Sequence, residues 1–188
     1  MLTNLTNSTI DERVKPIQCY SSTYCLAGAY TPYVDPTNPQ AAQECIAGTF
    51  CEAGSNSPEG KGKCQKGFYC PANANEMKPT DPGYFAEGTG NVDQEECRPG
   101  TFQDEYQQES CKECPIGAFC PETKMVEPYL CYPGTFAQSK GLTQCSNCPL
   151  GTYSDETGLT IERDCKKCEA NYVCTQTGLS SMQEAQGC

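Results

Sequence analysis

The chain has 188 residues, of which 17 are cysteine and none is histidine or tryptophan, and 24 acidic residues against 13 basic ones give a formal net charge of −11. Leu, Ile, Val and Phe together make up about 13% of the chain. A chain with less than roughly 20% of these residues and a high net charge is normally disordered. The cysteines reverse that expectation, because covalent bridges replace the core that such a chain cannot build.

The composition also excludes several classes of function. Without histidine, the chain lacks the base of Ser-His-Asp and Cys-His systems and the imidazole of most zinc sites. Its acidic balance argues against nucleic acid as a partner, since binding the phosphate backbone requires a basic surface. The apolar runs are too short for a membrane span. Dense cysteine indicates an oxidising compartment, so we expect an extracellular or cell-surface protein without cofactors.

Residues 1–18 are expected to form a polar leader. The segment lacks the basic and apolar regions of a signal peptide. Asn4 and Asn7 each begin an Asn-x-Thr/Ser sequon. We therefore expect both residues to carry N-glycans in an exported protein.

A repeat with the pattern Cys-x-x-Gly-x-aromatic follows the leader. Its copies begin at Cys25, Cys45, Cys64, Cys97, Cys114, Cys131 and Cys148. The run TDPGYF from Thr80 keeps the glycine and the aromatic residue but lacks the cysteine, and with it the copies are 16 to 20 residues apart. Such a period predicts a rod of small units that each pack on their neighbours.

Two weaker copies flank this series. CYSSTY from Cys19 has Ser22 in the glycine position, and the copy from Cys168 has Asn171 there. Asparagine is well tolerated at positive φ, so we expect a turn at Asn171. The aromatic residues of the repeat are expected to stack between units. They are Tyr30, Phe50, Tyr69, Phe85, Phe102, Phe119, Phe136 and Tyr153.

The expected fold class is a small disulfide-rich structure with little regular secondary structure, made of short β-strands and turns. It takes the form of an elongated rod of tandem repeats of about 17–20 residues. Residues 19–96 are expected to hold irregular repeats, with a degenerate unit at 80–96. Residues 97–188 are expected to hold regular repeats that continue beyond 188.

The cysteine spacings favour disulfides between neighbours along the chain. A shifted register would close the Cys-x-x-Cys pairs at 111–114, 145–148 and 165–168, and such rings are strained. The predicted bridges are Cys19–Cys25, Cys45–Cys51, Cys64–Cys70, Cys97–Cys111, Cys114–Cys120, Cys131–Cys145, Cys148–Cys165 and Cys168–Cys174. Interleaved pairings around Cys114, Cys120 and Cys131 stay open.

Cys188 is the one cysteine that neighbour pairing leaves over. Its partner is expected in a chain that continues beyond it. A free thiol or a bridge to another molecule is the alternative.

Metal binding competes with these interpretations at two places. Cys145, Cys148, Cys165 and Cys168 have the spacing of a four-thiolate zinc site, but the repeat generates these same cysteines, so we favour disulfides. The acidic residues within 93–96 and 104–105 lack the loop pattern of an EF-hand. We expect them to form a solvated surface.

The runs CRPGTF…CKECPIGAFC (97–120) and CYPGTF…CSNCPLGTY (131–153) resemble ephrin-receptor-like cysteine-rich repeats. More loosely, they resemble the small disulfide modules of tumour-necrosis-factor and growth-factor receptors. The resemblance is best over 97–168 and recognisable over 45–174. It departs at Thr80, at Asn171 and in the frequent Cys-x5-Cys spacing. The resemblance implies extended extracellular modules that act as spacers or interaction surfaces, with a cell-surface or ciliary fibre as one setting.

We therefore expect a non-catalytic structural, assembly or spacer protein whose partners are other proteins, through self-assembly or a larger extracellular complex. An enzyme would have to rely on carboxylate pairs alone. The alternative is a receptor or adhesin ectodomain that binds a specific protein ligand. Exposed aromatic residues outside the repeat positions would favour it, and the candidates are Tyr106, Tyr129 and Tyr132.

Overall fold

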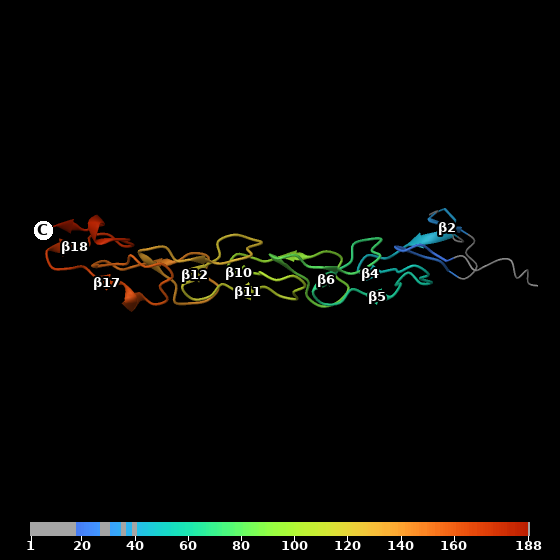
Figure 1. The fold of residues 1–188 in the computed structure, drawn as a ribbon, viewed down its shortest axis with the longest axis horizontal. Coiled ribbons are helices and arrows are strands. Elements are labelled where there is room, and N and C mark those ends of the chain that lie inside the picture. Colours follow the sequence, from blue (N-terminus) through green and yellow to red (C-terminus); the bar gives the residue numbers. More distant parts are fainter. Residues whose placement is uncertain (1–17, 27–30, 35–36, 39–40, 188) are drawn as a thin grey trace, which may run out of the picture.

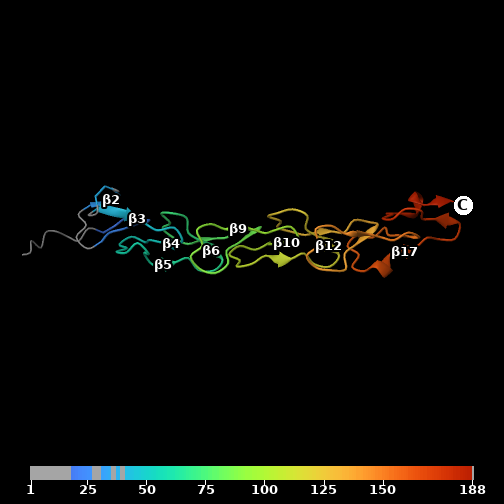
Figure 2. The same ribbon diagram turned by 180° about the vertical axis from the view of Figure 1, so that it is seen from behind.

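The computed structural model describes residues 18–26, 31–34, 37–38 and 41–187. The fold is an elongated rod in which the chain winds along one long axis, with the early (blue) and late (red) residues at opposite ends (Figure 1). The view from behind shows the same extended outline (Figure 2). The predicted fold class is confirmed, since the chain forms short strands and turns with eight disulfides among the described residues.

Regular secondary structure is limited to very short elements. The strands are β1 (Thr23–Tyr24), β2 (Thr31–Val34), β3 (Ala41–Glu44), β4 (Thr49–Phe50), β5 (Gly62–Lys63), β6 (Phe68–Tyr69), β7 (Lys78–Pro79), β8 (Tyr84–Phe85), β9 (Glu95–Glu96), β10 (Thr101–Phe102), β11 (Lys112–Glu113), β12 (Ala118–Phe119), β13 (Tyr129–Leu130), β14 (Thr135–Phe136), β15 (Ser146–Asn147), β16 (Thr152–Tyr153), β17 (Lys166–Lys167), β18 (Tyr172–Val173) and β19 (Gln186–Gly187), and the 3₁₀ turns are η1 (Glu162–Asp164) and η2 (Met182–Glu184). The sheet β1-β3-β2 has three strands, and the other sheets of the described residues are antiparallel pairs of consecutive strands.

From the unit that begins at Cys45 onwards, each repeat unit folds as one hairpin, as the unit that begins at Cys97 illustrates. Its fourth residue, Gly100, makes a turn with a φ of 88°. The aromatic strand β10 follows and pairs with β11, which lies just before the next unit, with Phe102 opposite Lys112. We call the fourth residue of a unit the turn residue and the seventh, which follows the aromatic residue, the post-aromatic residue.

The two weak copies, which begin at Cys19 and Cys168, have the turn of the other repeat units and are joined to the rod by the same backbone bonds. The turn residues Ser22 and Asn171 have φ values of 71° and 76°, so the predicted turn at Asn171 is confirmed. Cys25 does not begin a unit, because it is the post-aromatic residue of the unit that starts at Cys19; Tyr30 of the expected Cys25 copy lies outside the described residues. The units begin at Cys19, Cys45, Cys64, Thr80, Cys97, Cys114, Cys131, Cys148 and Cys168.

Backbone hydrogen bonds join each unit to the next, and the turn residue makes two of them. The N–H of Gly100 donates to the carbonyl of Cys120, the post-aromatic residue of the following unit, at 2.8 Å. The carbonyl of Gly100 accepts from the N–H of Cys114, the first residue of that unit, at 2.9 Å. The turn residue therefore has both of its polar backbone groups satisfied by the neighbouring unit.

Two further bonds complete the junction. The N–H of Lys124 donates to the carbonyl of Cys97, and the N–H of Gln103 donates to the carbonyl of Met125, both at 2.9 Å. The same four bonds occur at each of the eight described junctions, at N···O distances of 2.7 to 3.3 Å. They span the boundary between the regions 19–96 and 97–188, so both regions share one backbone architecture.

The turn glycines also contact the unit after next. A Cβ built on Gly100 would lie 2.5 Å from the carbonyl oxygen of Gly141, which is closer than real Cβ atoms approach. Gly48, Gly67, Gly83, Gly117 and Gly134 have equivalent contacts at 2.3 to 2.5 Å. The repeat thus requires glycine for two reasons, its positive φ and the close passage of a second backbone.

Aromatic residues of the repeat pack between adjacent units, as expected. Phe102 packs on the buried residues around the Cys114–Cys120 bridge of the following unit, and Phe136 is buried with Leu159 and two cysteines of its following unit. The other described repeat rings are partly buried. Among the described residues, the two ring pairs join Phe119 to tyrosines outside the repeat positions, Tyr129 and Tyr132.

The eight disulfides of the described residues join neighbouring cysteines. They are Cys19–Cys25, Cys45–Cys51, Cys64–Cys70, Cys97–Cys111, Cys114–Cys120, Cys131–Cys145, Cys148–Cys165 and Cys168–Cys174, with Cα–Cα distances of 5.7 to 6.3 Å. These are the pairs that the spacing favours. Cys188 lies outside the described residues.

The bridges have two geometries on the same backbone. A short bridge joins the first residue to the post-aromatic residue, as in Cys114–Cys120. A long bridge joins the first residue to a cysteine before the second strand, as in Cys97–Cys111. In units with a long bridge, the post-aromatic position holds a different buried residue: Gln103, Ala137 or Ser154.

The unit that begins at Thr80 keeps its place without a disulfide. Thr80 is fully buried, and its Oγ1 accepts a hydrogen bond from the N–H of Gln108 at 2.9 Å. The post-aromatic residue Ala86 is also buried. Thr80 and Ala86 therefore occupy the two positions that a short bridge joins in other units.

We expect Gly100→Ala to destabilise the rod by about 3 kcal/mol, because alanine is strained at positive φ and its Cβ meets the Gly141 carbonyl. The matched control is Gly151→Ala, where φ is also positive (82°) but nothing lies within 4 Å of the built Cβ. That variant should lose only about 1 kcal/mol. Chemical unfolding followed by circular dichroism measures both. Equal losses would contradict the close approach.

We expect the double substitution Thr80→Cys/Ala86→Cys to form a ninth bridge and to raise the free energy of unfolding by about 2 kcal/mol, as a short closed loop does. The reverse change, Cys114→Thr/Cys120→Ala, should cost a similar amount. Mass spectrometry after alkylation without reduction counts the new thiols, and thermal unfolding reports stability. Two alkylated thiols in the first variant would show that the Thr80 unit lacks the geometry of the others.

Candidate interaction surface

The cysteines with zinc-site spacing lie in three separate disulfides. Cys145 bonds to Cys131, Cys148 to Cys165, and Cys168 to Cys174. A disulfide sulfur carries no thiolate charge for a metal. Within the described ranges, no group of three or more His, Cys, Asp or Glu side chains is placed to hold a metal ion. No helix in this part of the chain has the length and apolar character needed to cross a membrane.

Two of the three tyrosines that the sequence singles out lie together. The ring of Phe119 packs against Tyr129, at 5.8 Å between centroids, and edge-on against Tyr132 at 5.7 Å. Tyr129 stands directly opposite Phe119 in the pairing of β12 with β13, which places both side chains on one face of the hairpin. Tyr106, in the preceding unit, is 62% exposed and takes part in no ring pair with the described aromatics.

The segment 126–132 concentrates exposed apolar surface. Val126, Tyr129, Leu130 and Tyr132 are exposed, at 44% to 62% of their surface. Just before them, Met125 is buried and packs on the Cys114–Cys120 bridge. The segment therefore rests on a fixed anchor while its side chains face solvent. Exposed apolar residues close together are a feature of protein interaction sites.

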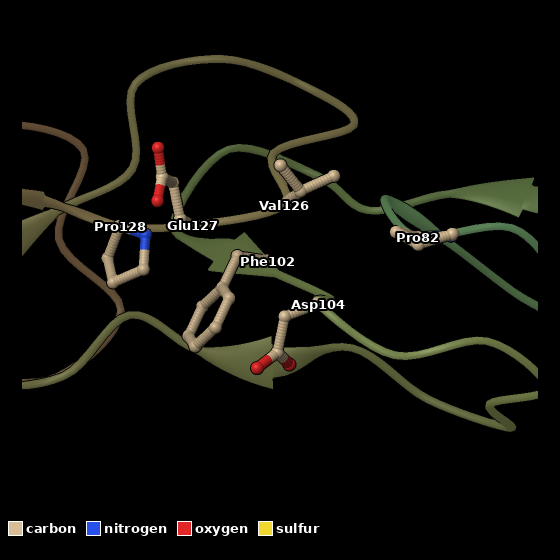
Figure 3. Close-up of a pocket in the computed structure, with 6 residues that line it drawn as sticks. All are labelled: Pro82, Phe102, Asp104, Val126, Glu127 and Pro128. Atoms are coloured by element: carbon tan, nitrogen blue, oxygen red, sulfur yellow. The ribbon is translucent and has the colours of Figure 1, made fainter.

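An open pocket of about 440 Å³ adjoins this segment. Three successive units contribute to it, and its lining residues are Pro82, Phe102, Asp104, Val126, Glu127 and Pro128. The Phe102 ring lies between Pro128 and Asp104 (Figure 3). From the sequence, Phe102 is expected only to pack between units, and none of the other apolar lining residues is identified as a candidate. The reason is that these residues come together only where three units meet.

Asp104 at the pocket belongs to a small charge cluster. The Lys112 ammonium contacts the Asp104 carboxylate at 2.5 Å and the Glu105 carboxylate at 3.4 Å. The hydrogen bond from Lys112 lowers the pKa of Asp104 below its ordinary value. Because one lysine faces two carboxylates, the cluster keeps one net negative charge. Lys166 makes the equivalent contacts with Asp155 and Glu156 in the unit that begins at Cys148, three units after that of Asp104.

A second lysine fixes the loop of the pocket to the earlier part of the rod. The Lys124 ammonium lies 2.8 Å from a Glu96 oxygen and 5.4 Å from the centre of the Tyr84 ring. Hydrogen bonds with Glu96 and Tyr84 raise the pKa of Lys124. Since the Lys124 N–H also donates to the Cys97 carbonyl, both the side chain and the backbone of Lys124 hold the loop before Val126 to the earlier part of the rod.

The predicted glycosylation sites Asn4 and Asn7 lie outside the described residues, as does most of the leader 1–18. In comparisons with known proteins, the chain matches no model of a protein family, and no curated protein matches it significantly.

We expect Asp104 to titrate below the ordinary aspartate pKa of 3.8 and Lys112→Met to raise its pKa towards that value. A carboxyl with a lowered pKa in the folded state stabilises the fold above its unfolded pKa, and that contribution is lost as the pH falls through the folded pKa. NMR titration of the side-chain carboxyls measures both values.

Lys166→Met is the control for this titration, since it should raise the pKa of Asp155 and leave Asp104 unchanged. An Asp104 pKa that does not respond to Lys112→Met would contradict the ion pair. Because both residues are exposed, salt should weaken the effect.

Proposed function

We propose that the protein is a non-catalytic extracellular rod with a structural, assembly or spacer role. The observation that carries the proposal is the unbroken series of four backbone bonds at every described junction. Since each unit is also tied to its neighbours on both sides, such a rod keeps a set distance between whatever lies at its two ends. The disulfides then stabilise every described unit except the one that begins at Thr80.

The oxidising compartment rests on the cysteine chemistry. Eight disulfides in a chain with so few aliphatic residues favour a secreted or cell-surface location. The sequons at Asn4 and Asn7 are compatible with export. The resemblance to ephrin-receptor-like repeats supports spacing and protein contact as the role, and it is the sole support for a cell-surface or ciliary fibre.

A receptor or adhesin ectodomain is the second candidate. The exposed residues Tyr129 and Tyr132, which pack against the partly buried Phe119, favour it, because aromatic residues dominate the energetics of protein interfaces. The two candidates are compatible in one molecule, since a rod with a local binding surface acts both as a spacer and as a receptor.

Small-angle scattering tests the rod in solution. We expect a radius of gyration well above the value of about 16 Å that a compact globule of this length would have, and a distance distribution with a long tail. After alkylation without reduction, the mass should show at most one free thiol, from Cys188. A compact radius of gyration, or several free thiols, would contradict the proposed function.

A further inference from the structure

We propose that the pocket beneath Val126 binds an arginine side chain of a basic partner protein. The inference rests on the proposed function only in requiring a folded rod exposed to other proteins. It goes further by assigning a surface and the chemistry of its ligand. The lining combines apolar walls with carboxylates at the rim, which is the combination that a long side chain with a cationic tip requires.

The walls suit the aliphatic part of an arginine. Phe102, Val126, Pro128 and Pro82 line the pocket with apolar surface, and Pro82 lies apart from the other three (Figure 3). The partly buried Phe102 ring provides a surface for a guanidinium, which stacks on aromatic rings better than an ammonium does. The chain already places one cation over a ring, Lys124 at Tyr84.

The carboxylates supply the charge complementarity. Asp104 stays ionised beside Lys112, and the cluster with Glu105 retains one negative charge because a single lysine serves both acids. Glu127 adds a second charge from the opposite side, and it makes no ion pair or hydrogen bond within the described part of the chain. Arginine binds carboxylates through a planar set of donors, which favours it over lysine.

The pocket is preformed, which lowers the cost of binding. Its three units are joined by the junction bonds, among them Gln107 N–H to the Thr80 carbonyl and Lys124 N–H to the Cys97 carbonyl, both at 2.9 Å. Met125 anchors the loop that carries Val126 and Glu127. A rigid site of this kind loses little conformational entropy when a ligand enters.

The charge of the whole chain selects the kind of partner. With a net charge of −11, two copies of this protein repel one another, whereas a basic protein is attracted over a longer range. The exposed ring of Tyr129 lies on the same hairpin as the loop of the pocket, and that of Tyr132 lies at the start of the next unit. They extend the contact area beyond the single arginine.

The test is an NMR titration of the ¹⁵N-labelled protein with the blocked peptide acetyl-Gly-Arg-Gly-amide, and with the same peptide carrying citrulline. We expect the arginine peptide to shift the amides of Phe102, Val126 and Glu127 and to bind about tenfold more tightly than the uncharged peptide. Added salt should weaken its binding. Equal affinity for the two peptides, or shifts confined to other residues, would overturn the proposal.

Variants separate this role from a structural one. Asp104→Asn and Glu127→Gln should each weaken binding about two- to fivefold, while Asp155→Asn, at the equivalent position of a later unit, should leave it unchanged. Lys112→Met removes the competing cation and should strengthen binding by a similar factor, with Lys166→Met as its control. Weaker binding in Lys112→Met, or equal losses in Asp104→Asn and Asp155→Asn, would contradict the site.

The outcome is independent of the test of the rod. If the scattering shows a rod but the peptide fails to bind, the proposed function stands and the pocket assignment falls. If the same amides shift with protein concentration alone, a second copy of the chain occupies the surface, and the arginine proposal is wrong.

Discussion

The structure depends on the positive φ of one residue in each unit. That turn directs the N–H and the carbonyl of the turn residue towards the following unit, and two of the four junction bonds start from it. Glycine is the usual solution because the carbonyl of the unit after next passes within contact distance of where a Cβ would be. Asn171 and Ser22 occupy the same conformation near the two ends of the described rod.

The disulfides are secondary to this backbone arrangement. Short and long bridges occur on the same hairpin, and the Thr80 unit has neither but keeps all of its junction bonds. What the bridges supply is resistance to unfolding in a chain with little apolar core, because they limit the freedom of the unfolded chain. The backbone therefore determines the architecture, and the disulfides determine its stability against unfolding.

The surface of the rod changes where a unit departs from the repeat. The loop after Cys120 carries Met125, which is buried against the bridge, and then a run of exposed apolar residues up to Tyr132. Neighbouring units present polar or charged residues at the corresponding second strands, such as Glu95 and Lys112. A local change in side chains thus creates a distinct surface without altering the course of the backbone.

The sequence by itself determined the class of the structure and its covalent pattern. Cysteine spacing and the recurring glycine are local features, so the turns, the short strands and the neighbour disulfides could be read from them. The tertiary structure alone decided that Cys25 closes a unit instead of opening one, and that Phe119 packs against two tyrosines outside the repeat positions, Tyr129 and Tyr132. It also decided that Phe102 meets Val126 and Pro128 at one pocket. These contacts depend on how the hairpins stack along the rod, and this stacking is set by junction bonds between backbone groups of different units, which the local pattern of one unit does not specify.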